Sequence, residues 1–94
     1  MTPLETIAQG ASDYQNIYNQ SKNFVLSNGV KEDVFLRRWD FYYDLHKLKT
    51  GTMIVPHALF QNGAAFYMAN RLRERANWID LELRKDIIEK RYMG

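Results

Sequence analysis

The sequence of 94 residues contains no cysteine, only two prolines and five glycines. Without cysteine the chain cannot form a disulfide framework, a thiolate metal site or a cysteine nucleophile. Apolar runs are short, as at residues 64–67, whereas a membrane helix needs about 20 residues. The N-terminal residues also lack a basic stretch followed by an apolar one. We therefore expect a cytoplasmic, intracellular protein without a membrane partner.

The composition is that of one folded domain. Hydrophobic residues make up 46% and charged residues 26% of the chain, as in ordinary globular proteins, so residues 1–94 are expected to form a single domain. Aromatic residues reach 14%, more than so small a core can hide completely. Some of these rings are therefore predicted to face a partner.

The N-terminal residues predict a helix of about 25 residues. Thr2 suits the N-cap, Pro3 the first helical position, and Glu5 the third position of a capping box. The residues Ser27-Asn28-Gly29 favour a C-terminal cap. Between these signals, steps of three and four residues place one stripe on a single helix face: Leu4, Ile7, Ala11, Tyr14, Tyr18, Ser21 and Val25.

A second helix is predicted over residues 31–49, with acids in its first turn and lysines in its last. Its apolar residues spread over more than one face, so this helix is expected to be sandwiched or exposed to a partner.

The third helix is predicted to open at Pro56, after an extended linker, and to run towards Tyr92. The turn dipeptide Asn62-Gly63 favours a bend in it more than a break. Its packing stripe contains several small residues: Ala65, Ala69, Leu72, Ala76, Ile79, Leu83 and Asp86. The predicted fold is thus an all-α bundle of three main helices, or four if the chain breaks, with a long C-terminal helix.

Catalytic and ligand motifs are missing. His46 and His57 have no second histidine at metal-ligand spacing, and His46 is expected on a polar helix face. Glu82, Asp86 and Glu89 share a helix face, which would suit a carboxylate site, but nearby bases favour a solvated ion-pair face. Pairs Asp80–Arg84 and Asp86–Lys90 are expected there. With no nucleophile elbow and no phosphate loop, we predict a non-enzymatic protein with no cofactor and no metal.

Nucleic-acid binding is the alternative function. The net charge is +2 with a pI near 9.0, which permits such a partner without requiring it. The basic candidates are Arg71, Arg73, Arg75, Arg84 and Lys85. Helical geometry separates Arg73 from Arg71 and Arg75, however, and Glu74 offsets part of the charge.

Protein association is the primary prediction. The second helix mixes Arg, Trp and Tyr as interfaces do, and the third presents alanines for close helix contact. The predicted interface comprises Phe35, Arg38, Trp39, Tyr42, Tyr43, Ala65, Ala69, Leu72, Ala76 and Ile79. We expect an assembly or adaptor subunit that binds copies of itself or a larger complex. An inhibitor using the same rings on a foreign target would look the same in sequence.

In its aromatic and basic spacing, the segment 13–61, with Asp13-Tyr14 and residues 35–43, resembles the helical tail of cyclopropane-fatty-acid-synthase-type methyltransferases. The glycine-rich cofactor-binding strand and turn of those enzymes have no counterpart in this sequence, so the resemblance implies no catalysis.

Overall fold

The computed structural model describes residues 2–51 and 62–91. These residues form three helices and no strand: α1 (Pro3–Ser27), α2 (Glu32–Thr50) and α3 (Asn62–Glu89). The predicted all-α class with a long C-terminal helix is confirmed. The predicted linker, the helix start at Pro56 and His57 lie outside the described residues. The dipeptide Asn62-Gly63, where a bend is predicted, forms the first described residues of α3.

Helix α1 begins and ends where its sequence signals indicate. The Thr2 hydroxyl accepts a hydrogen bond from the Glu5 backbone N–H (3.1 Å), and the Thr2 backbone N–H donates to the Glu5 carboxylate (3.3 Å), which is the reciprocal capping box. At the other end, Gly29 follows with a φ of 87°, a conformation that a glycine adopts without strain. Both predicted boundaries of α1 are confirmed.

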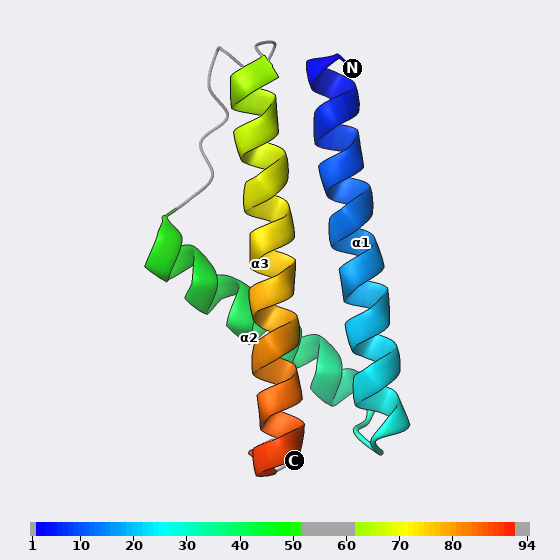
Figure 1. Cartoon of the computed structure of the whole chain (residues 1–94). Coiled ribbons are helices and arrows are strands. Elements are labelled where there is room, and N and C mark those ends of the chain that lie inside the picture. The colour runs from blue at the N-terminus through cyan, green and yellow to red at the C-terminus, as the bar shows by residue number, and fades with distance from the viewer. Residues whose placement is uncertain (1, 52–61, 92–94) are drawn as a thin grey trace.

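Helices α1 and α3 lie side by side and run in the same direction (Figure 1). Asp13 pairs with Arg73, which is 60 residues further along the chain. Phe24 and Arg84 are also 60 residues apart, and the Arg84 guanidinium lies 4.1 Å from the ring centre of Phe24. Two parallel helices require a connection that returns the chain to its starting end. Part of that return is α2, which crosses behind α3 in this view.

The α1–α3 contact depends on small side chains. A Cβ atom on Gly10 would lie 2.7 Å from both Cα and Cβ of Ala69, closer than carbon atoms can pack. We call the α3 residues 65, 69, 72, 76, 79, 83 and 86 the inner stripe. All of them are buried except Leu72, which is half-buried. The predicted packing stripe of the third helix is therefore confirmed.

The aromatic part of the core lies between α1 and α2. The Trp39 ring meets Tyr14 and Tyr18 edge-on at centroid distances of 5.9 and 4.8 Å, and Phe35 lies 5.3 Å from Tyr18. The Trp39 indole N–H donates to the Tyr14 hydroxyl at 2.9 Å, so the polar atom of this buried ring is satisfied. These rings fix α2 against α1 at the point where the two helices cross.

Candidate protein-interaction surface

Most side chains of the predicted interface lie in the chain's own core. Seven are buried: Phe35, Trp39, Tyr42, Ala65, Ala69, Ala76 and Ile79. The other three, Arg38, Tyr43 and Leu72, are half-buried. The physical reason is that α2 crosses both other helices, so more than one of its faces is covered within the chain. The seven buried side chains are therefore not available as a docking face, which corrects the expectation that they are exposed.

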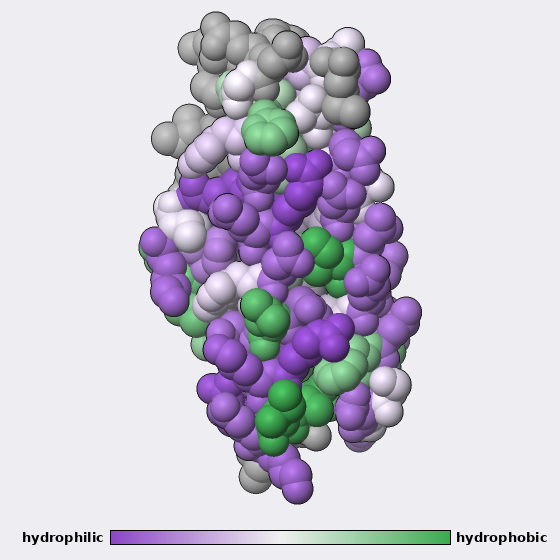
Figure 2. Space-filling view, in the orientation of Figure 1, coloured by the Kyte–Doolittle hydropathy of each residue, from purple (hydrophilic) through white to green (hydrophobic). Residues whose placement is uncertain are grey.

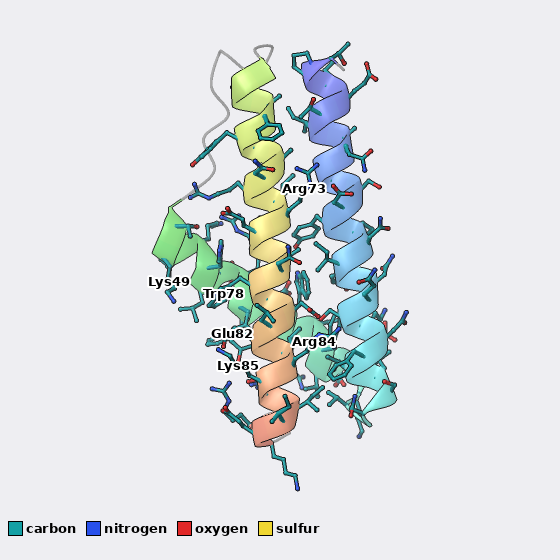
Figure 3. All side chains as sticks on the ribbon, in the orientation of Figure 1. Lys49, Arg73, Trp78, Glu82, Arg84 and Lys85 are labelled. Carbon is teal, nitrogen blue, oxygen red and sulfur yellow. The ribbon has the colours of Figure 1, made fainter. Side chains whose placement is uncertain are left out.

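The predicted nucleic-acid contacts are engaged within the chain. Arg73 pairs with Asp13 at 2.6 Å. Arg84 pairs with Asp80 at 3.0 Å, as the sequence predicts. The hydrogen bond from Arg73 holds the pKa of Asp13 below its usual range. Lys85 lies 3.5 Å from the carboxylate of Glu82. Arg73 and Arg84 lie on the α1 side of α3 and Lys85 on the opposite side (Figure 3), so these cations do not form one basic patch.

The guanidinium of Arg71 also has partners within the chain. It donates to the backbone carbonyl oxygens of Thr50 and Gly51 and to the Tyr67 hydroxyl. These bonds tie the C-terminal end of α2 to the first turns of α3. Because its guanidinium is bound within the chain, Arg71 is a poor candidate for phosphate binding.

Arg75 is a buried cation without an acidic partner. Its side chain is 1% exposed, and it donates to His46 Nδ1 (3.1 Å), the Tyr43 hydroxyl (3.3 Å) and the Thr50 hydroxyl (3.5 Å). All eleven Asp and Glu residues lie within the described ranges, and no ion pair joins any of them to Arg75. The face of the Tyr43 ring, 4.9 Å away, supplies part of the missing compensation.

His46 is buried beside Arg75 rather than placed on a polar face, so that expectation is wrong. Burial, and then the positive charge of Arg75, lower the pKa of His46 from its ordinary value of 6.5. Its Nδ1 accepts the hydrogen bond from Arg75, which requires that nitrogen to be unprotonated. The histidine therefore serves as a neutral acceptor for a buried cation.

Asp86 is the second buried charge, and it has three donors. Arg38 lies 2.8 Å from its carboxylate, Arg91 lies 3.4 Å away, and the Tyr42 hydroxyl donates to it at 2.8 Å. Burial and then the hydrogen bond to Asp86 raise the pKa of Tyr42. The expected exposed pair with Lys90 is wrong, because Asp86 lies on the inner stripe and faces α2.

A second stripe of α3, which sequence reasoning missed, faces away from the inner stripe. We call it the outer stripe; it follows the same steps of four and three residues through Tyr67, Arg71, Glu74, Trp78, Leu81, Lys85 and Ile88. Three of its apolar members remain open to solvent, with Tyr67 59%, Leu81 58% and Ile88 76% exposed. The signal was present in the sequence, because Leu81 and Ile88 are seven residues apart and neither fits the inner stripe.

The surface around the outer stripe is mixed rather than uniformly apolar. On the face where α3 lies in front, hydrophobic side chains form separate groups among hydrophilic ones (Figure 2). Trp78 is half-buried, since its ring lies 5.9 Å from Tyr42 and 5.3 Å from His46, and Lys49 lies 5.2 Å from it. Near the start of α3 the surface contains a cavity of about 240 Å³ lined by Thr50, Tyr67, Asn70, Arg71 and Glu74.

No family model, no curated protein and no solved structure matches the chain. Within the described ranges, no helix is long and apolar enough to span a bilayer, and no three His, Asp or Glu side chains are grouped to hold a metal ion.

Proposed function

We propose that this chain is a non-enzymatic protein-interaction module, an assembly or adaptor subunit, that docks an amphipathic helix on the outer stripe of α3. The observation that carries the proposal is the exposure of Tyr67, Leu81 and Ile88 at heptad spacing on a helix whose opposite face packs inside the chain. Large apolar side chains in such a row lose unfavourable contact with water when a second helix covers them.

The stripe suits a helix better than an extended peptide. Its steps of three and four residues leave the holes between side chains that receive knobs from a facing helix. The same helix already packs closely against another helix on its inner stripe, where Ala69 meets Gly10 of α1. A docked helix would need apolar side chains to cover those of the stripe, a base to face Glu74 and an acid to face Lys85.

The disposition of the basic side chains favours this proposal over nucleic-acid binding. Arg73 and Arg84 are paired with acids, and Arg75 is buried. Phosphate binding requires several cations on one accessible surface. For the chain to bind phosphates with Arg73 or Arg75, it would have to break the ion pair between Arg73 and Asp13 of α1 or the hydrogen bonds from Arg75 to α2.

Site-specific photo-crosslinking in the native cells tests the proposal. A photoreactive phenylalanine analogue replaces either Leu81 or Leu4, which is a matched control because it is a leucine of similar exposure, 60% against 58%, in the first turn of α1. We expect a discrete protein adduct from position 81 and none from position 4. No adduct from position 81, equal adducts from both positions, or a nucleic-acid adduct would overturn the proposal.

A further inference from the structure

We infer that the helix docked on the outer stripe is α3 of a second copy of this chain, antiparallel to the first, with Glu74 of each copy facing Lys85 of the other. This inference rests on the proposed function and specifies its partner and register. It follows from the order of side chains along the stripe, from its charges and from the cavity beside it.

The order of charges selects the direction of pairing. In a parallel pair each residue meets its own copy, which places Glu74 against Glu74 and Lys85 against Lys85. Like charges in facing positions destabilise such pairs. In an antiparallel pair centred between Trp78 and Leu81, Glu74 of each copy faces Lys85 of the other. Both of these contacts join an acid to a base.

The same register groups the apolar side chains. Trp78 of each copy would lie over Leu81 of the other, which creates two apolar layers at the centre of the pair, flanked on each side by a Glu74–Lys85 layer. An isologous interface of this kind has to be self-complementary. From Arg71 to Ile88 the sequence of the outer stripe satisfies that requirement without an insertion or a shift, and Tyr67 lies beyond this paired part.

The outermost layer brings Ile88 of one copy beside Arg71 of the other. Arg71 lines the cavity of about 240 Å³, together with Tyr67 and Thr50, and Ile88 is 76% exposed. An isoleucine side chain is smaller than this cavity and would remove its apolar surface from water on entering it. The cavity thus offers a place for the most exposed apolar side chain of the stripe.

Helix α2 contacts Trp78 and Arg71 at one edge of the outer stripe, but it crosses behind α3 and does not cover the front of that helix (Figure 1). In Figure 3 Arg73 and Arg84 lie on the α1 side of α3, while Trp78 and Lys85 lie on the other side. The face between them points towards the viewer. The paired part of the stripe, from Arg71 to Ile88, is about 26 Å long, so one helix pair forms an interface at the small end of the usual range, and the dimer should be reversible.

Charge reversal tests the ion-pair layers. We expect Glu74→Lys and Lys85→Glu, measured singly by sedimentation equilibrium, each to weaken dimerisation about tenfold, because each places two like-charge pairs in the interface. The double variant should restore the wild-type constant. Asp44→Lys, an exposed reversal on α2, should leave it unchanged, and circular dichroism checks that every variant is folded. A double variant as weak as the single ones would overturn the inference.

Cysteine crosslinking tests the register, because the chain has no cysteine of its own. Under mild oxidation, a mixture of Glu74→Cys and Lys85→Cys chains should form a disulfide-linked dimer, while neither variant should do so alone. Crosslinking of each variant with itself would overturn the antiparallel register. A wild-type chain that stays monomeric while position 81 photo-crosslinks to a different protein would overturn the second copy but leave the proposed function standing. A chain that stays monomeric and gives no photo-crosslink at position 81 would overturn both the second copy and the proposed function.

Discussion

The inner and outer stripes of α3 have the same spacing but different side chains. The inner stripe contains three alanines, all fully buried, which allow α1 to approach until Ala69 touches Gly10. The outer stripe instead combines large apolar side chains with charged ones, and Leu81 and Ile88 stay exposed. The comparison teaches that periodicity identifies a packing stripe, whereas side-chain size and charge decide whether it is used inside the chain or left for another helix.

Replacing one leucine on each stripe should separate their roles most clearly. Leu83 is 2% exposed and Leu81 58%, although the two lie only two positions apart. We expect Leu83→Ala to lower the free energy of unfolding by about 3 kcal/mol, because it removes buried apolar surface and leaves a cavity. Leu81→Ala should lower it by about 0.5 kcal/mol or less. Urea denaturation measures both values, and equal effects would contradict the assignment of the stripes.

Removing Asp86, the buried charge of the inner stripe, should have the next largest effect on the free energy of unfolding. Asp86→Ala leaves Arg38 and the Tyr42 hydroxyl without their acceptor, so we expect a loss of about 2 to 3 kcal/mol. Glu89→Ala is the control, since that carboxylate is 56% exposed, and it should change the unfolding free energy little. Chemical denaturation of both variants gives the comparison. A small effect of Asp86→Ala would mean that its contacts are not formed in solution.

A single methyl group at the α1–α3 contact should have a smaller but measurable effect. We expect Gly10→Ala to destabilise the fold by about 1 to 2 kcal/mol, because the new Cβ would overlap Ala69 and force the helices apart. The control is Gly63→Ala, where, among the described residues and apart from the helix's own backbone, no atom lies within 4 Å of the added Cβ and alanine favours the helix. Thermal unfolding of both variants tests this point. An unchanged midpoint for Gly10→Ala would show that the helices are not in close contact.

The effect of pH through His46 should be the smallest. Its pKa in the folded chain is lowered from 6.5, so the fold favours the neutral ring. This stabilisation is complete above pH 6.5 and is lost as the pH falls through the lowered pKa of the folded state. We expect the midpoint temperature of unfolding to decrease when the pH is lowered from about 7 to about 5. The decrease should be smaller in His46→Gln. An identical pH dependence in both proteins would contradict the neutral-acceptor role.

The fold could be predicted from sequence because its signals are local. Thr2 and Glu5 specify where α1 begins, Gly29 and Gly51 follow helix ends with φ values of 87° and 84°, and the alanines specify the inner stripe. The parallel direction of α1 and α3 could not be predicted, because it depends on where the connection places α3 rather than on any one helix.

The candidate surface was harder to predict than the fold. The rings of Phe35 and Trp39 look like interface residues in sequence, but the crossing of α2 over two helices buries them. Asp86 and His46 look like surface residues, yet both are buried and satisfied by arginines from other helices, Arg38 and Arg75. Each error concerns a residue whose environment is built by a distant part of the chain.

The central claim is that the inner stripe of α3 holds the fold while the outer stripe remains available for association. The most direct test is the absolute mass in solution, measured by light scattering over a concentration series, for the wild-type chain and for Leu81→Asp and Leu4→Asp. We predict that the wild-type and Leu4→Asp masses rise from 11.2 kDa towards twice that value, while Leu81→Asp stays monomeric with unchanged helicity. A Leu81→Asp chain that loses its helicity, or that associates as the wild type does, would contradict the claim.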